Sequence, residues 1–430
     1  MKTYLLYVAK DIRLSEKSVP IPGADQVLIK PKYTGICGSD VHYFQHGYCG
    51  NFIPKRPFAL GHEFAGVVDS IGANVIGLKV GDEVAVDPSM PCGSCKHCRS
   101  GHYNLCLSMR YFGSASCDPH LDGAMGQYLV VPATNCHILP AGISMAQASL
   151  LEPLCVAMHA VKQADRIAGT SILITGGGPI GQLILRVVRA FGAHDITVSD
   201  VSEFARAFSL KSGANKVVNP LEENAWKYFN GFDIVFEASG SPSALANGIQ
   251  VTRRGGSVVL VGTLPESFSI PGNLIMNKEL KLYGSFRFAN VFEDAMNMVA
   301  AGIINLDGIV TDTFSFDDIP KAMQYALDKN GVIMDDEHQR FLDELQQYLL
   351  NENILVHYDA DPKSNPESYD QLVEYIDYYS QTTSAPVCAS LMQGYFKYLK
   401  KDSKGANLLW NTEILKLKKF VNLDEKTAYG

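Results

Sequence analysis

No segment of this 430-residue chain is apolar over the length that a membrane-spanning helix requires. The N-terminal segment MKTYLLYVAKDIRL has only a short apolar stretch before Lys10 and Asp11, too short for a secretion signal. The chain also lacks internal repeats, low-complexity segments and the composition of a disordered or fibrous protein. These absences predict a cytosolic globular protein of two or three domains that does not bind membranes.

An excess of positive charge is missing as well, because the formal net charge is -8. Proteins that bind nucleic acid normally present a basic face that replaces the phosphate counterions. Lys96, His97 and Arg99 lie close together, but no extended basic stripe continues from them. The sequence therefore predicts no nucleic-acid partner.

The ten cysteines lack the distribution of a disulfide framework, since four are clustered and the others are scattered. The clustered ones have the spacing C-x2-C-x2-C-x7-C, which allows one loop to surround a zinc ion with four thiolates. We expect a structural zinc site at Cys92, Cys95, Cys98 and Cys106.

The pattern of the chain changes three times. Residues 1–150 contain short strands broken by Gly and Pro, typical of an irregular β domain. Residues 151–286 alternate strands and helices, which predicts a doubly wound parallel sheet and an α/β fold. Residues 287–333 hold two helix-sized stretches expected to return to the first domain. Residues 334–430 are expected to form an additional C-terminal helical segment of unknown role.

A second, open zinc site is predicted from Cys37 in GICGSD, His62 and Glu63 in LGHEFAG, and Glu152 in LLEPL. Zinc that activates an alcohol needs three protein ligands and a free position, and a thiolate, an imidazole and a carboxylate all suit it. For Glu152, a helix-capping role is the alternative.

The segment ITGGGPIG follows a predicted strand and opens a helix, as a turn that binds a dinucleotide pyrophosphate does. Asp200 ends the next strand, where a carboxylate accepts the ribose hydroxyls of NAD and repels the 2′-phosphate of NADP. NAD is therefore favoured, although Arg206 lies nearby. The predicted cofactor-binding residues are Gly176, Gly178, Pro179, Ile180, Gly181 and Asp200.

The chain carries, in this order, CGSD, GHE, the loop with Cys92, Cys95, Cys98 and Cys106 (the cysteine lobe), EPL and GGGPIG. This series of motifs resembles the zinc-dependent medium-chain dehydrogenase family over about residues 1–333. Within it, CGSDVHYFQHGYCGNF and MRYFGSASCDPHLDGAMGQY are most similar to the L-idonate 5-dehydrogenase branch, with the sorbitol and xylitol dehydrogenases next. The resemblance implies a discontinuous GroES-like catalytic domain packed on a Rossmann domain, and a dimer or tetramer.

The resemblance also implies that Cys37, His62 and either Glu63 or Glu152 bind catalytic zinc, and that the lobe cysteines bind structural zinc. The implied reaction is hydride transfer to NAD from a secondary alcohol of a sugar acid or polyol, with L-idonate to 5-keto-D-gluconate as the specific expectation. A non-catalytic nucleotide-binding protein is the alternative from another class.

Four further residues are candidates for moving the alcohol proton or for binding the substrate carboxylate. Ser39 and His42 are placed to begin a proton relay out of the site. A sugar acid also needs a cation, and a guanidinium pairs best with a carboxylate. Arg110 in MRYFGS is the first candidate and Arg287 in GSFRF the second, with a surface or interface ion pair as the alternative for both.

Overall fold

A computed structural model describes residues 1–226 and 231–330 of the chain. The predicted helical segment at 334–430 lies outside the described residues. In the described part, no helix has both the length and the apolarity needed to cross a membrane.

The first domain is built on a five-stranded antiparallel sheet. Its order is β8 (Leu129–Pro132), β3 (Gln26–Gly35), β4 (Glu63–Ile71), β5 (Glu83–Val86) and β9 (Cys136–Ile138). Alternate apolar residues of these strands, such as Val27, Ile29 and Phe64, meet in one buried cluster. Two two-stranded antiparallel sheets accompany the five-stranded sheet: β1 (Lys2–Val8) with β2 (Asp11–Glu16), and β6 (Ser89–Met90) with β7 (Arg110–Tyr111).

Short helices interrupt this domain. They are α1 (Gly38–His46), α2 (Lys96–Arg99), the 3-10 helices η1 (Tyr103–Leu105) and η2 (Ala133–Asn135), and α3 (Met145–Ser149). The irregular β domain predicted for the N-terminal part is confirmed.

The second domain contains a six-stranded parallel sheet. Its order is β12 (Lys216–Val218), β11 (Asp195–Ser199), β10 (Ser171–Thr175), β13 (Phe232–Glu237), β14 (Thr252–Leu260) and β15 (Lys281–Gly284). The order reverses between β10 and β13, which is the topological switch of a doubly wound sheet. The doubly wound α/β fold is therefore confirmed.

Helices cover both faces of this sheet. Ile172 and Ile174 of β10 pack in the cluster that includes α4 (Leu151–Lys162) and α5 (Pro179–Ala190), whereas Leu173 packs toward α7 (Pro242–Val251) and α8 (Gly272–Lys278). Because side chains alternate along a strand, both faces of β10 are buried. The remaining helix of this domain, α6 (Glu203–Lys211), packs beside β11 and β12.

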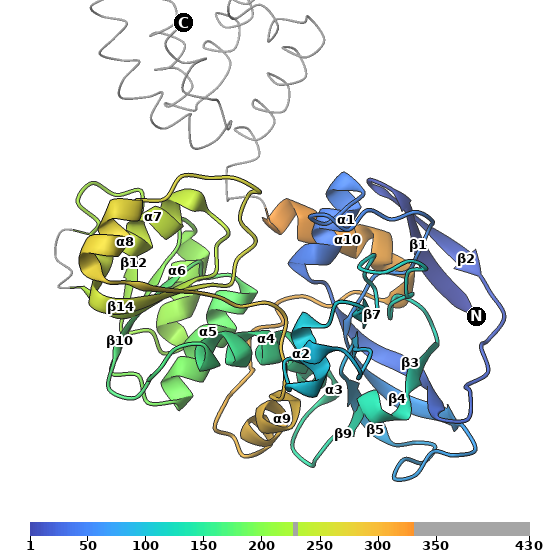
Figure 1. Cartoon of the computed structure of the whole chain (residues 1–430). Helices are drawn as coiled ribbons and strands as arrows, with labels where there is room; N and C mark the ends of the chain where they lie inside the picture. Colours follow the sequence, from blue (N-terminus) through green and yellow to red (C-terminus); the bar gives the residue numbers. More distant parts are fainter. Residues whose placement is uncertain (227–230, 331–430) are drawn as a thin grey trace, which may run out of the picture. The chain divides into compact units, whose positions relative to one another are not determined.

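After β15 the chain forms α9 (Phe292–Ala300), η3 (Phe316–Asp318) and α10 (Ile319–Asn330). Helix α10 lies beside α1 of the first domain (Figure 1), where Met323 joins the cluster of Tyr43 and Phe44. Helix α9 packs instead on α4, through Phe292, in the core that also covers the parallel sheet.

Candidate functional site

Cys37 stands at the N-terminus of α1, immediately after β3. The side chain of Asp40 accepts a hydrogen bond from the Cys37 amide (3.0 Å), which closes a capping box at the first turn. The other Asp40 oxygen accepts from the Gly61 amide (3.2 Å). This fully buried carboxylate therefore joins the Cys37 turn to the segment that carries His62.

His62 and Glu63 lie where β4 begins, opposite the end of β3. The register pairs Glu63 with Gly35, and a Cβ at Gly35 would collide with the Glu63 carboxylate. Glycine at this position therefore leaves the space that the Glu63 side chain occupies. The Nδ1 atom of His62 is buried without a hydrogen bond, 3.7 Å from Asp40, so its proton would point toward that carboxylate and leave Nε2 free to bind a metal.

Cys37, His62 and Glu63 bring one ligand atom each to within 4.8 Å of one another, close enough to share one metal ion. Burial, together with the nearby acidic groups of Cys37 and Glu152, raises the pKa of Glu63 well above its ordinary value. Burial also lowers the pKa of His62, but the charges of Asp40, Glu152 and Glu63 outweigh that effect and raise it overall. Burial and Asp40 raise the pKa of Cys37 to about 12.

Ionising this buried cluster of acidic groups needs positive charge nearby. A divalent cation would supply that charge, and the thiolate, imidazole and carboxylate donors suit zinc. The residues therefore fit the predicted open zinc site.

Glu152 does not belong to the three-ligand group. It is buried in the first turn of α4 and accepts a hydrogen bond from the Tyr111 hydroxyl (2.5 Å). Burial raises the pKa of Glu152, whereas His62 and the Tyr111 hydroxyl lower it in part. The guanidinium carbon of Arg287 lies 4.4 Å from the centre of the Tyr111 ring. Glu152, Tyr111 and Arg287 thus form a connected group beside Cys37, His62 and Glu63.

The two candidates for the proton relay lie on α1. The Oγ atom of Ser39 is 3.5 Å from Nε2 of His62, so Ser39 borders the three-ligand group. His42 follows one turn later on the exposed side of the helix. Burial and the neighbouring His46 lower the pKa of His42, which keeps this imidazole neutral near neutral pH.

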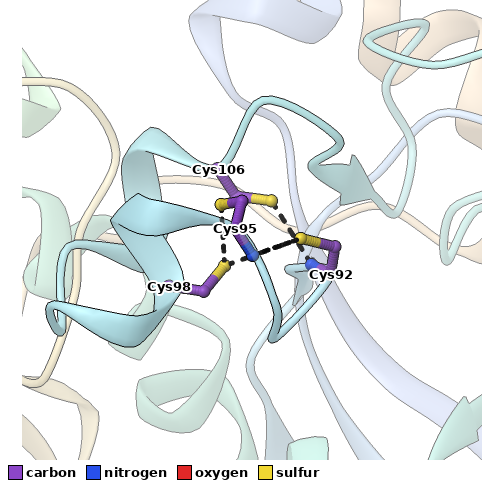
Figure 2. A group of neighbouring side chains, drawn as sticks. All are labelled: Cys92, Cys95, Cys98 and Cys106. Atoms are coloured by element: carbon purple, nitrogen blue, oxygen red, sulfur yellow. Dashed lines mark hydrogen bonds between the residues drawn. The ribbon is translucent and has the colours of Figure 1, made fainter.

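The four lobe cysteines converge as the spacing predicts. Their sulfur atoms lie within 4.8 Å of one another, and Figure 2 shows all four side chains pointing toward a common centre. Backbone amides of Ser94 and Cys95 lower the pKa of Cys92 to about 6. Four convergent thiols with one already favoured as a thiolate fit a tetrahedral zinc ion.

The glycine-rich turn joins β10 to α5. Gly176 has φ of 95°, and a Cβ there would lie 2.8 Å from the Ser239 amide nitrogen. A Cβ at Gly181 would collide with the Gly176 carbonyl, so both positions require glycine. Gly178 caps α5 with open space around it, Pro179 is the first helical residue, and half-buried Ile180 packs on the core. The turn presents a helix N-terminus where a pyrophosphate can bind.

Asp200 lies at the end of β11 beside this turn. Its carboxylate accepts from the Gly177 and Ser202 amides, both at 2.7 Å. The Arg206 guanidinium donates to the Asp200 and Val201 carbonyl oxygens, both at 2.8 Å. The arginine therefore binds the backbone at the start of α6.

The structure does not bring the two candidate arginines together. Arg110 and Tyr111 are consecutive in β7, so their side chains point to opposite faces. Tyr111 points inward to Glu152 and Arg287, whereas Arg110 is exposed. The sequence did not point to Tyr111 or Asp40 as site residues. A strand of two residues, such as β7, has no periodicity that could have indicated Tyr111.

Comparisons with known proteins agree with this geometry. The family described as "Alcohol dehydrogenase GroES-like domain" matches residues 23–141, and "Zinc-binding dehydrogenase" matches residues 179–301. Sorbitol dehydrogenase from Bacillus subtilis is 36% identical over 335 residues, which cover 76% of this chain and 94% of that protein. D-xylulose reductase A from Aspergillus oryzae is 36% identical over 342 residues, covering 77% of this chain and 94% of that protein.

Among solved structures, L-idonate 5-dehydrogenase from Escherichia coli superposes with a TM-score of 0.73 at 37% identity, covering 76% of this chain and 95% of that chain. The cofactors of the family are zinc and a nicotinamide dinucleotide. With the GroES-like and doubly wound domains described above, these similarities show that the chain belongs to the zinc-dependent medium-chain dehydrogenase family, in its polyol dehydrogenase-like group.

Proposed function

We propose that this chain oxidises a secondary alcohol of a sugar acid with NAD, and that its substrate is L-idonate, which becomes 5-keto-D-gluconate. The observation that carries the proposal is the half-buried guanidinium of Arg287 beside the buried group of Cys37, His62 and Glu63. Within residues 1–226 and 231–330, no carboxylate lies within ion-pair distance of the Arg287 guanidinium, although the charge of Glu152 acts on it from farther away. A sugar acid can supply that carboxylate.

Cys37, His62 and Glu63 would hold the catalytic zinc, and the lobe cysteines would hold the structural zinc. Glu152 would remain outside the ligand set, held by Tyr111. The chemistry that zinc and NAD supply when bound is Lewis-acid activation of an alcohol oxygen and acceptance of a hydride. Asp40 would orient His62 through Nδ1.

The alcohol proton needs a route to solvent. Ser39 borders His62, and His42 on the same helix is exposed and neutral at neutral pH. In our proposal, the Ser39 hydroxyl accepts the proton while donating its own toward His42, which releases it to water.

NAD is our choice of nucleotide because the Asp200 carboxylate lies at the glycine-rich turn. A carboxylate there binds ribose hydroxyls and repels a 2′-phosphate. Arg206, which could favour NADP, donates to two carbonyl oxygens instead.

Sorbitol and xylitol are the alternative substrates, because sorbitol dehydrogenase and D-xylulose reductase A are as similar in sequence as the idonate enzyme. A non-catalytic nucleotide-binding protein is the alternative from another class, although such a protein would have little need for an open metal site. The reduced cysteines of the described part suit a cytosolic enzyme, and we expect a homo-oligomer.

The test is NADH or NADPH formation by the purified full-length chain with L-idonate, sorbitol and xylitol side by side. We expect the highest kcat/KM with L-idonate and NAD. A clear preference for sorbitol or xylitol would make a neutral polyol the substrate in place of L-idonate. Arg287 would then have no role as a carboxylate partner. Absence of turnover with all three alcohols, with zinc and NAD bound, would favour the non-catalytic alternative.

A further inference from the structure

The cysteine lobe is hydrogen-bonded to the segment that carries Arg287. The Asn104 side chain donates to the Phe286 carbonyl (2.9 Å), and the Tyr103 hydroxyl accepts from the Asn290 amide (2.8 Å). The Asn290 side chain donates to the Gly101 carbonyl (2.8 Å). All three lobe residues lie between the metal-ligating positions 98 and 106, so the lobe holds the backbone on both sides of Arg287.

This segment needs to be held, because its backbone is strained. Arg287 has φ of 52°, a value that residues other than glycine and asparagine seldom adopt, and the left-handed φ of 57° at Asn290 is one that asparagine tolerates. Such conformations persist only where surrounding contacts determine them. The three hydrogen bonds from the lobe are contacts of this kind.

A second connection runs through the Tyr111 side chain. Its ring shares a small cluster with Cys106 and Met109, and Cys95 and Cys98 pack against it. The same ring lies against the Arg287 guanidinium. One aromatic side chain therefore connects the cluster of the lobe cysteines with the arginine.

The lobe itself has little apolar core that could keep it in shape. Between residues 92 and 109, only Asn104, Cys106 and Met109 are buried. A loop with so little buried apolar surface depends on cross-links for its order, and a metal held by four cysteines is such a cross-link.

We propose that the lobe is a positioning element for the substrate: Tyr103 and Asn104 hold Arg287 in its binding position, and zinc in the lobe sets substrate affinity by fixing those two residues. The inference rests on the proposed function, in which Arg287 pairs with the substrate carboxylate. Tyr103 and Asn104 are positioning residues, because they act through Arg287.

The kinetic test uses full-length Tyr103→Phe and Asn104→Ala variants. Each loses one hydrogen bond to the Arg287 segment, so the KM for the best acidic substrate should rise about 5- to 10-fold, while kcat, NAD affinity and zinc content per chain stay close to wild type. His102→Ala is the matched control, since His102 is an exposed lobe residue whose ring contacts Ser100. An unchanged KM in both variants would overturn the proposal.

A double-mutant cycle tests whether Asn104 acts through Arg287. Asn104→Ala should raise KM in the wild type but have little effect in an Arg287→Ala background. Equal effects in the two backgrounds would show that Asn104 acts independently of Arg287, and would overturn its role as a positioning residue.

Hydrogen exchange gives a readout that needs no turnover. The Asn290 amide donates to Tyr103, so its exchange should speed up in Tyr103→Phe, and also in Cys92→Ser, which loses a lobe ligand. Unchanged protection of this amide in Cys92→Ser would contradict the link between lobe zinc and Arg287. If no alcohol is oxidised, the proposed function fails, while the exchange result still decides whether the lobe orders this segment.

Discussion

The guanidinium carbon of Arg287 lies 4.4 Å from the centre of the Tyr111 ring, and the hydroxyl of the same tyrosine donates to Glu152. The aromatic face stabilises the cation, by about 0.5–2 kcal/mol for stacked pairs of this kind. The hydroxyl at the same time stabilises the buried carboxylate. Tyr111 thus contacts a positive and a negative group at the edge of the proposed zinc site, and the guanidinium forms no ion pair there that would exclude a ligand carboxylate.

Arg287→Ala should weaken binding of a sugar acid more than binding of a neutral polyol. Hydrogen bonds to a charged group contribute about 1.5–3 kcal/mol, so the KM for L-idonate should rise about 10- to 100-fold while that for sorbitol changes by less. Steady-state kinetics with both substrates measures the difference. Arg110→Ala, which removes an exposed arginine, is the comparison. A large effect of Arg110→Ala with none from Arg287→Ala would assign the carboxylate to Arg110.

Gly35→Ala should lower catalytic-zinc affinity without unfolding the chain. The backbone at Gly35 is ordinary, but the new Cβ would collide with the Glu63 carboxylate and displace it. Loss of one ligand position should leave about one zinc ion per chain where the wild type binds two, as measured by metal analysis. Gly38→Ala is the matched control, because a Cβ there meets nothing within 4 Å. Equal zinc content in both variants would remove Glu63 from the ligand set.

Cys106→Ser should remove the lobe zinc and destabilise the protein. Loss of a structural metal belongs to the large effects of single substitutions, about 2–5 kcal/mol in the free energy of unfolding. Thermal unfolding and zinc analysis check both expectations. Cys136→Ser changes a cysteine outside both ligand groups and should keep full zinc content. A Cys106→Ser variant with full zinc content would contradict the structural site.

Zinc uptake by the lobe should release protons and depend on pH. Backbone amides lower the pKa of Cys92 to about 6, whereas partial burial and the neighbouring cysteines raise the pKa of Cys98 to about 12. At neutral pH, zinc must therefore displace the Cys98 proton. The lowered pKa means that the fold stabilises the Cys92 thiolate. This stabilisation is fully present above the ordinary thiol pKa and is lost as the pH falls through about 6, where Cys92 takes up a proton.

Zinc affinity should accordingly rise with pH above neutrality and fall steeply below about pH 6. Competition with a chromophoric chelator, repeated across this range, measures the affinity of the lobe. An affinity that does not vary with pH would show that the thiols are already deprotonated before zinc binds.

Asp200→Ala should reduce the preference for NAD over NADP. The variant loses the acceptor for the ribose hydroxyls, so kcat/KM with NAD should fall about 10- to 100-fold while kcat/KM with NADP falls less or rises. Asp195→Ala is the control, since it removes a carboxylate at the start of the same strand that pairs with Lys216. Unchanged nucleotide preference in Asp200→Ala would exclude Asp200 from nucleotide choice.

The parts of the site that the sequence predicted are those with local spacing. The lobe cysteines lie within one loop, and the glycine-rich turn joins a strand directly to its helix, so each pattern can be recognised without the rest of the fold. The doubly wound sheet followed from alternating strands and helices for the same reason.

The features that the sequence did not predict depend on contacts between residues that are far apart in the chain. The pairing of Gly35 with Glu63 brings this carboxylate, rather than Glu152, to Cys37 and His62, and no local pattern specifies that register. Asn104 bonds a carbonyl 182 positions away, so nothing near it in the sequence indicates its partner. For Arg110, the face of a two-residue strand decided its exposure, and so short a strand has no periodicity to read.

The most direct test of the account is NADH formation from L-idonate by the purified full-length chain before zinc removal, after removal by a chelator, and after zinc is restored. We predict turnover that disappears with zinc, returns with it, and exceeds turnover of sorbitol and xylitol under the same conditions. Turnover that persists when metal analysis finds no zinc, or no turnover of any of the three with zinc and NAD bound, would contradict the proposal of a zinc-dependent dehydrogenase acting on these substrates.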